Sequence, residues 1–202
     1  MSPSNSKSTF LSFNISTAFR ICFVLLVRGC PNVECETNAI FGSIPKSLTT
    51  LVAEIAISTA RVVRLFGFDP KVAFVSHSTF GQPLTSRTKH IRSAVEILKE
   101  RKVDFEFDGD MQPDVALNPE YEELYPFAKI VGKANILIMP GQHSAAISYK
   151  LMKTIGETKV IGPLLIGLGL PIEIAPLRSS TSEILNLASI AAYSSQVIDY
   201  KK

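Results

Sequence analysis

The sequence has little cysteine, no acidic side chain in its first 33 residues and no long apolar run there. Its three cysteines all lie within the first 35 residues, and their spacing matches no zinc or redox motif, so a disulfide framework is not expected. The apolar run Ile21 to Val27 is too short to span a bilayer. The formal charge of +3 is accounted for by Lys7, Arg20 and Arg28, so the rest of the chain is balanced and predicts no nucleic-acid surface.

Residues 1–48 differ in composition from the rest of the chain, and three interpretations of them remain open. A secretory signal would need a longer apolar core and a small-x-small cleavage site. A lipoprotein-type Cys30 would directly follow Arg28 and Gly29, which is a poor cleavage context. The favoured interpretation is a disordered or non-homologous leader without a functional role. On this interpretation the protein is cytoplasmic, does not associate with a membrane, and has its functional domain in residues 49–202.

From residue 49 onward, helical and strand-like patterns alternate. The sequence predicts helices over 49–66, 89–102, 144–155 and 181–195, strands over 71–76, 104–108, 134–139 and 171–175, and a helical turn over 119–125. Gly67 is a natural end for the first of these helices. This alternation predicts an α/β fold of three layers, in which a mostly parallel sheet is covered on both faces. Since the carboxyl ends of parallel strands meet at one edge, we expect the four loops that follow them to line one cleft. These loops are 76–87, 108–118, 139–144 and 176–182.

The first of these loops is rich in hydroxyl groups. Ser76, Ser78 and Thr79 follow a strand and precede Gly81, which would let a ligand approach the backbone closely. They are therefore candidate substrate-binding residues. The alternative is that the hydroxyls only shape a turn.

The second loop carries three aspartates, Asp108, Asp110 and Asp114. Asp114 stands between Pro113 and an apolar segment, so we expect it to be half buried and to need a partner, which makes it a candidate binding residue. The alternative is a helix-capping or turn aspartate.

The last loop presents Arg178, Ser179 and Ser180 just before a predicted helix. A guanidinium group, hydroxyls and a helix N-terminus at one point suit a phosphate or diphosphate group. The alternative is a plain N-cap with Glu183 in the first turn, and a cap is expected in either case. No GxSxG elbow accompanies the histidines, and no HExxH pair is present, so neither a serine hydrolase site nor a metal site is predicted.

Six segments in unbroken order carry a resemblance to a known family. They are VAFVSHSTFG (72–81), AVEILKER (94–101), DFEFDGDMQPDVALNP (104–119), GKANILIMPGQHSAAISYKLM (132–152), VIGPLLIGLGLPIEI (160–174) and SEILNLASIAA (182–192). The chain resembles the phosphate acetyl/butyryl transferase family. Within it, the sequence is most similar to the phosphotransacetylase-like C-terminal domain of bacterial NADP-dependent malic enzymes.

The resemblance implies a lobe like that of the isocitrate and isopropylmalate dehydrogenases, with an acetyl-CoA or acyl phosphate site between two lobes. The family reaction passes an acyl group between phosphate and the thiol of coenzyme A, with no covalently bound cofactor. This chain resembles only the later part of such a domain, so it is expected to be truncated. It is also expected to act as a homo-oligomer or with a partner lobe.

The last loop departs from the pattern of active transferases, which carry an Arg-Gly pair and an acid six positions after the arginine. One register places Leu177 at the arginine and Glu183 at the acid, whereas the other keeps Arg178 but places Ile184 at the acid. Arg178 and Glu183 are thus the candidate catalytic residues, although neither register preserves both. Malic-enzyme versions are regarded as acetyl-CoA-sensing domains, which is the function expected here. The alternatives are an active transferase completed by a partner lobe, and a relic that acts only in subunit association.

Overall fold

The computed structural model of the 202-residue chain describes residues 22–23, 46–155, 162, 164 and 170–197. The chain divides into two compact units near Ala145. The first unit contains the sheet, and the second contains the C-terminal helix. Each unit is described by itself below.

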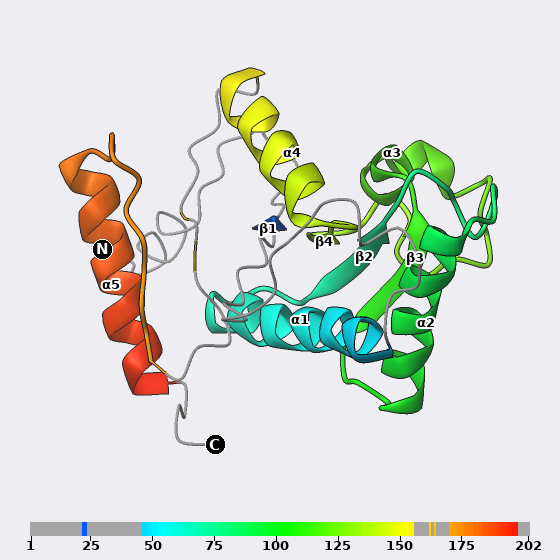
Figure 1. Cartoon of the computed structure of the whole chain (residues 1–202), viewed down its shortest axis with the longest axis horizontal. Helices are drawn as coiled ribbons and strands as arrows, with labels where there is room; N and C mark the ends of the chain where they lie inside the picture. Colours follow the sequence, from blue (N-terminus) through cyan, green and yellow to red (C-terminus); the bar gives the residue numbers. More distant parts are fainter. Residues whose placement is uncertain (1–21, 24–45, 156–161, 163, 165–169, 198–202) are drawn as a thin grey trace, which may run out of the picture. The chain divides into compact units, whose positions relative to one another are not determined.

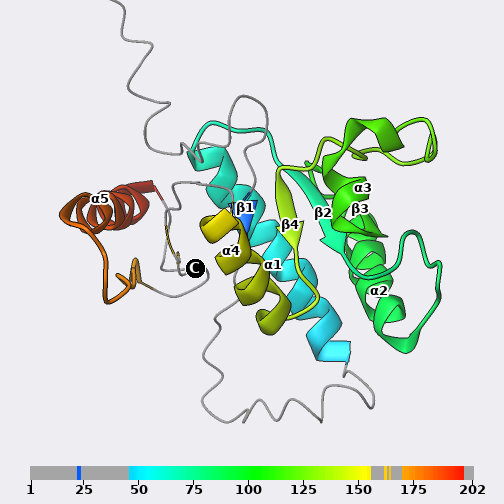
Figure 2. The same cartoon turned by 90° about the horizontal axis from the view of Figure 1, so that it is seen from above.

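A four-stranded parallel sheet organises the first unit. Its strands are β1 (Cys22–Phe23), β2 (Lys71–Val75), β3 (Glu106–Met111) and β4 (Ile136–Ile138). Their order across the sheet is β1-β4-β2-β3, and all three neighbouring pairs are parallel (Figure 2). The expected α/β fold with a parallel sheet is therefore confirmed.

The longer helices agree with the periodicity of the sequence to within a few residues. The described residues form α1 (Lys46–Leu65), α2 (Ser86–Glu100), the short α3 (Pro113–Leu117), the 3-10 helix η3 (Pro119–Tyr121), α4 (Gln142–Ile155) and α5 (Thr181–Val197). Gly67 ends α1 as predicted, because it adopts a φ of +81° that other residues rarely adopt. α2 begins with a capping box in which Thr85 and Thr88 each satisfy the other's backbone N–H.

The hydrophobic core lies between the sheet and the helix pair α1 and α2 (Figure 1). Phe74 and Val72 of β2 point into it and are fully buried. The alternate residues Ala73 and Val75 are buried as well, so β2 is covered on both faces, as its uniformly apolar sequence predicts. Ala53, Ala56, Val63, Ala94, Val95, Leu98, Ile136 and Ile138 complete this cluster.

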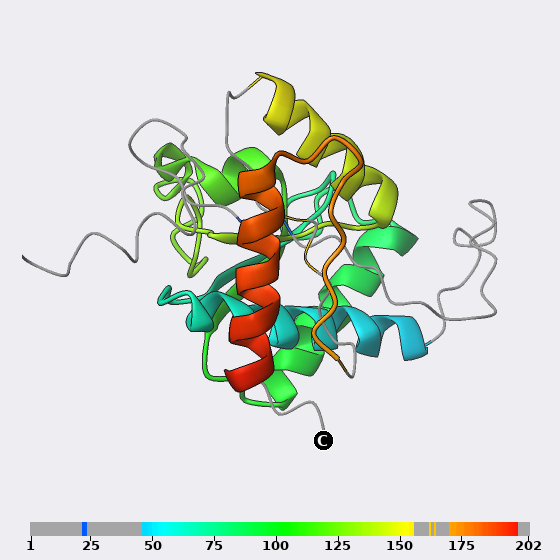
Figure 3. The same ribbon diagram turned by 90° about the vertical axis from the view of Figure 1, so that its left-hand side faces the viewer.

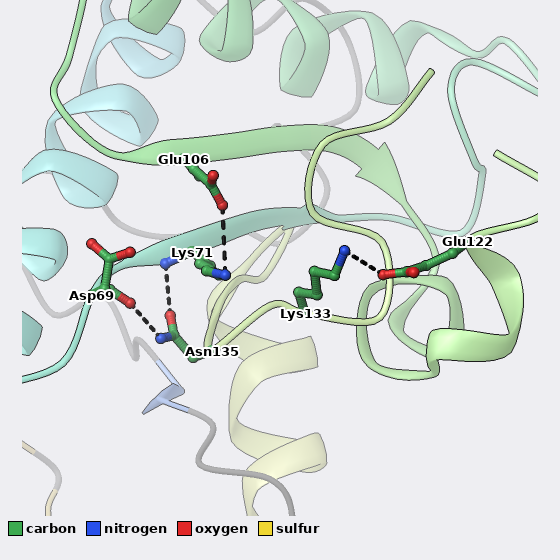
Figure 4. A network of polar contacts seen from close by, with 6 residues as sticks. All are labelled: Asp69, Lys71, Glu106, Glu122, Lys133 and Asn135. Atoms are coloured by element: carbon green, nitrogen blue, oxygen red, sulfur yellow. Dashed lines mark hydrogen bonds and ion pairs between the residues drawn. The ribbon is translucent and has the colours of Figure 1, made fainter. Parts of the chain in front are cut away.

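A polar network fixes the amino ends of the central strands (Figure 4). The Asn135 amide accepts a hydrogen bond from the Lys71 backbone N–H and donates one to the Asp69 carbonyl, both at 2.7 Å. Lys71 Nζ lies 3.7 Å from Glu106 Oε2 across β2 and β3. These contacts set the strand register at the edge opposite to the predicted loops.

The structure corrects three expectations. β3 was expected over 104–108, but it starts at Glu106 and continues to Met111, because Asp108 and Gly109 still pair with β2. The short helix α3 was not predicted. Over 171–175 the described residues form only an isolated bridge, Leu164 with Glu173, so the predicted last strand is wrong.

The predicted leader lies outside the described residues except at two places. Cys22–Phe23 pairs with Ile136 and Leu137 of β4, and α1 begins at Lys46, three residues before the predicted helix start. In the second unit, α5 forms a continuous helix, coloured orange to red in Figure 3. Within the described ranges, no helix is both long and apolar enough to cross a membrane.

Candidate functional site

The segments that follow β2, β3 and β4 meet at one edge of the sheet. These strands are parallel neighbours, so Ser76, Gln112 and Met139 leave the sheet on the same side. The expectation of a shared edge is therefore confirmed for three loops. The fourth, 176–182, follows no strand and belongs to the other compact unit.

A fully buried carboxylate, Asp110, organises this edge. Its Oδ2 accepts hydrogen bonds from the hydroxyls of Ser76, at 3.1 Å, and of Ser78. Its Oδ1 accepts from the Gly81 backbone N–H at 3.0 Å. Asp110 and Ser78 are 0% exposed, and Ser76 is 5% exposed. A buried carboxylate is tolerated when several donors satisfy it, and here three donors come from one loop.

Backbone bonds fasten the same loop to β3. The Ser76 N–H donates to the Met111 carbonyl at 3.0 Å, and the Phe80 N–H donates to the Asp110 carbonyl at 2.6 Å. Phe80 has a φ of +48°, in the left-handed region that a bulky residue rarely occupies. The loop from Ser76 to Gly81 is thus held in a single unusual shape.

Thr79 and Gln112 connect this loop to the start of α3. Thr79 Oγ1 accepts a hydrogen bond from the Gln112 N–H at 3.2 Å, and Gln112 Nε2 donates to the His77 carbonyl at 2.9 Å. Between the buried Ser76 and Ser78, His77 is exposed at the sheet edge.

Gly109 allows the close approach of β3 to β2 on which this arrangement depends. A Cβ atom at Gly109 would lie 2.8 Å from both Cβ and the carbonyl oxygen of Phe74. Its φ of +145° also belongs to the region that favours glycine. No other residue fits this position without moving β2.

The structure brings together three of the predicted binding residues, Ser76, Ser78 and Thr79. It also shows that their hydroxyls face the protein: two are directed to Asp110, and the third to Gln112. Asp110 was not among the predicted site residues. The sequence offers little to single out Asp110, because it is one of three aspartates in what reads as a loop, and the sequence does not reveal which of the three is buried.

Asp114 lies apart from this cluster. The expectation that it is half buried is wrong: it is exposed in the first turn of α3, where its Oδ2 accepts a hydrogen bond from the Tyr121 hydroxyl at 3.1 Å. This bond and the negative charge of Asp114 raise the pKa of Tyr121 above its usual value. The alternative interpretation, a helix-capping or turn aspartate, is not met either, because Gln112 is the N-cap of α3 and Asp114 lies within its first turn.

In the second compact unit, the residues before α5 form the predicted cap. Glu183 Oε2 accepts hydrogen bonds from the Ser180 N–H at 2.7 Å and the Ser180 hydroxyl at 3.0 Å. In return, the Glu183 N–H donates to Ser180 Oγ at 3.3 Å. This is a reciprocal capping box. The Ser179 N–H donates to the Pro176 carbonyl at 3.0 Å in the turn that precedes it.

Leu177 and Arg178 form the exposed tip of this turn. Leu177 is fully exposed, and Arg178 is exposed and makes no ion pair with any described residue. The described residues also contain no group of three or more histidine, cysteine or acidic side chains arranged to hold a metal ion.

Comparison with known proteins connects this geometry to one family. The family model for phosphate acetyl/butaryl transferase matches residues 38–192. Over 142 residues the chain is 47% identical to the NADP-dependent malic enzyme of Rhizobium meliloti (strain 1021), an alignment that covers 70% of this chain and 19% of that protein. It is 34% identical over 142 residues to the phosphate acetyltransferase of Bacillus subtilis (strain 168), which covers 70% of this chain and 44% of that protein.

Solved structures agree with the sequence comparison. A phosphotransacetylase from Streptococcus pyogenes is similar with a TM-score of 0.70 and 34% identity, covering 73% of this chain and 45% of that one. For EutD phosphotransacetylase from Staphylococcus aureus, the TM-score is 0.67 and the identity 32%, over 72% of this chain and 46% of that one. The chain thus spans less than half of these relatives and about a fifth of the malic enzyme. The resemblance inferred from the six segments is confirmed.

Proposed function

This chain belongs to the phosphate acetyl/butaryl transferase family, and from this premise we propose that it binds acetyl-CoA as a regulatory ligand, in the manner of a malic-enzyme C-terminal domain. In this proposal the domain does not itself transfer the acetyl group. A ligand of this kind would place the protein in the cytoplasm, and a second copy or a partner lobe would complete the cleft.

The sequence identities to known proteins favour a domain of the malic-enzyme type over a stand-alone transferase. Identity is 47% to the Rhizobium meliloti malic enzyme and 34% to the Bacillus subtilis phosphate acetyltransferase over alignments of equal length. Both relatives are much longer than the matched part. The activity of a whole malic enzyme is therefore not part of this proposal.

The observation that carries the proposal is the use of Glu183 as a helix cap. In an active transferase of this family, an acid at this position would accompany an arginine six residues earlier. Here that earlier position is Leu177, which is fully exposed, and the Glu183 carboxylate binds Ser180 instead. Without a guanidinium at position 177, six residues before Glu183, the developing charge on a transferring acyl group would lack the electrostatic stabilisation that this arginine supplies.

Arg178, Ser179 and Ser180 remain proposed contacts for a phosphate of coenzyme A, because the exposed guanidinium has no competing ion pair in the described part of the chain. Ser76, Ser78 and Thr79 are proposed to act through the fixed shape of their loop, since their hydroxyls bind within the protein. Asp114 is proposed to lie only at the rim of the ligand site, because its side chain is exposed.

Two measurements on the full 202-residue chain test the proposal. Calorimetric titration with acetyl-CoA measures binding, and an arsenolysis assay with acetyl phosphate and coenzyme A measures turnover in the same sample. Binding without turnover is the expected result. No binding by folded protein would contradict the proposal, and if turnover is absent as well, subunit association is the remaining function.

The second candidate, an active phosphate acetyltransferase, is favoured by the likeness to solved phosphotransacetylases. Turnover in the arsenolysis assay would establish it. The variant Arg178→Ala separates the two functions: a sensor should lose only acetyl-CoA affinity, whereas a catalyst should lose rate. Arg61→Gln serves as the control, because Arg61 is an exposed arginine of α1 outside the proposed site.

A further inference from the structure

Apolar side chains from two segments of the first unit meet beside the loop after β2. The Phe80 ring centroid lies 4.9 Å from that of Phe127 and 5.4 Å from that of Tyr125, and the last two are 6.1 Å apart. Leu84 Cδ1 lies 3.7 Å from where a Cβ atom of Gly81, the residue after Phe80, would be. We call Phe80, Leu84, Tyr125 and Phe127 the apolar patch.

Much of the apolar patch is open to solvent. Phe127 is 68% exposed and Leu84 is 55% exposed. Leu124, three residues before Phe127, is 67% exposed. Large apolar side chains that are exposed together are typical of a surface that contacts another protein.

The backbone on both sides of the apolar patch is fastened to β3. The Phe80 N–H donates to the Asp110 carbonyl at 2.6 Å. Two residues after Phe127, the Lys129 N–H donates to Asp108 Oδ2 at 2.9 Å. Because both segments are already ordered, little further conformational entropy is lost when this surface is covered.

Basic side chains flank the apolar patch on the side of α2. Arg92 packs against Gly81, with its Cζ 3.3 Å from where a Gly81 Cβ would be. Lys89 lies three positions earlier on the same face of α2. Both side chains are exposed, and neither makes an ion pair with a described residue. Since α2 has no acidic residue before Glu96, this basic flank carries unbalanced positive charge.

Acidic side chains flank the apolar patch on the side of η3. Glu120 and Glu123 are exposed and make no ion pair with a described residue. Glu122, which lies between them in the sequence, is paired with Lys133 at 2.5 Å. Three acids and two lysines give residues 118–133 a net charge of −1. This acidic flank is therefore opposite in sign to the basic flank of α2.

An apolar patch between a basic and an acidic flank is complementary to a second copy of itself. We propose that two copies of this chain pair through this surface about a two-fold axis, so that Lys89 and Arg92 of one copy face Glu120 and Glu123 of the partner subunit. A partner with charge of a single sign would be attracted by one flank and repelled by the other. The inference rests on the proposed function in one respect, because it names a second copy, not a partner lobe, as what lies beside the loop after β2.

Sedimentation velocity of the full chain over a range of concentrations, without acetyl-CoA, tests the pairing. The unmodified protein should form a dimer that dissociates more readily at high salt, because the exposed charges are then screened. Phe127→Ser should weaken the dimer about tenfold or more, because it removes an exposed aromatic anchor. The control Leu151→Ser removes a leucine of α4 in the second unit that is 53% exposed, and should leave the dimer unchanged.

Reversal of one flank at a time tests the charge pattern. One variant carries Glu120→Lys and Glu123→Lys, and the other carries Lys89→Glu and Arg92→Glu. Each alone should weaken the dimer about tenfold or more, because flanks of like charge then meet. An equimolar mixture of the two should recover association, since each reversed flank meets a flank of opposite sign. Charges that act within one chain would not be rescued by mixing.

A double reversal outside the surface is the matched control for these variants. Arg61→Glu with Lys150→Glu changes two exposed basic residues of α1 and α4 and should leave the dimer unchanged. Circular dichroism of every variant checks that it is folded.

The inference is overturned if the unmodified protein is monomeric, if Leu151→Ser weakens the dimer and Phe127→Ser does not, or if mixing the two reversed variants recovers nothing. Charge reversals that leave the dimer unchanged would overturn it as well. A monomer that binds acetyl-CoA would remove this inference alone, whereas a dimer with the expected variant behaviour that binds no acetyl-CoA would remove only the proposed function.

Discussion

The Ser78 hydroxyl donates a hydrogen bond to Oδ2 of Asp110, and neither side chain is exposed. The two residues are 32 positions apart in the sequence and meet because β2 and β3 are parallel neighbours. The Ser76 hydroxyl and the Gly81 N–H donate to the same buried carboxylate, so its two oxygens accept three hydrogen bonds in all. The shape of the loop after β2 therefore depends on one acid of β3.

Asp110→Ala should lower the free energy of unfolding by about 2–4 kcal/mol, because it leaves buried donors of the loop without their acceptor. Urea unfolding followed by circular dichroism measures the change. Asp114→Ala is the control: that side chain is exposed, so a change within about 0.5 kcal/mol is expected. Equal unfolding midpoints for the two variants would show that Asp110 does not hold the loop.

Three glycine variants separate steric overlap from backbone strain. Gly109→Ala should destabilise by about 3 kcal/mol or more, because the new Cβ would lie 2.8 Å from the Phe74 carbonyl oxygen in a strand pair. Gly67→Ala should cost about 1 kcal/mol, since its φ is +81° but nothing lies within 4 Å. Gly141→Ala has open space and no such φ and should be nearly neutral. Thermal unfolding of the three proteins should reproduce this order, and a neutral Gly109→Ala would contradict the close approach of β3 to β2.

The ion pair between Arg64 and Asp104 should contribute a pH-dependent stability. The Arg64 guanidinium, at 2.7 Å, holds the pKa of Asp104 below its usual value of 3.8. Because the pKa is lower in the folded state, the contribution is present above the unfolded pKa and is lost as the pH falls through the folded pKa. Asp104→Asn should therefore be less stable than the unmodified protein at neutral pH and equally stable in strong acid.

Unfolding free energies of both proteins, measured from neutral to acidic pH, check this difference, which is small because the pair is exposed. Glu123→Gln, which removes an exposed carboxylate with no ion pair among the described residues, should show no such trend. A difference that persists unchanged into strong acid would exclude the ion pair as its cause.

Asp114→Asn should lower the pKa of Tyr121 toward its ordinary value of 10.0, because it removes both the charge and the carboxylate acceptor that raise it. Ultraviolet difference titration of the tyrosinates measures the shift, and Tyr121→Phe identifies which part of the curve belongs to Tyr121. The raised pKa favours the protonated phenol in the folded state. Its contribution to stability is thus present below pH 10.0 and is lost as the pH rises through the folded pKa.

Local sequence was sufficient to predict a structural feature where the physical cause of that feature lies in neighbouring residues. The end of α1 at Gly67 and the cap before α5, with Glu183 in the first turn, each depend on residues within one helical turn, and both were predicted. β2 was predicted because an apolar run of this length is buried on both faces. The family could likewise be identified from the sequence, because the six segments that resemble it occur in unbroken order.

The expectations that failed depend on distant residues. β3 continues past Asp108 because β2 supplies partners up to Met111. α3 has only five residues and is held by distant backbone, with the Val115 carbonyl accepting from Gly132 at 2.9 Å. Such a helix is too short for its own periodicity to reveal it.

The sequence by itself determined the longer helices, the order of β2, β3 and β4, the parallel α/β class and the family, because each follows from local periodicity or from motifs in a fixed order. Only the tertiary structure decided which of three aspartates is buried. Asp108, Asp110 and Asp114 have the same side chain and similar neighbours, but Asp110 alone faces the loop after β2 and finds three donors there. The burial of a charge depends on the partners that the fold brings to it, and those partners lie about 30 residues away along the chain.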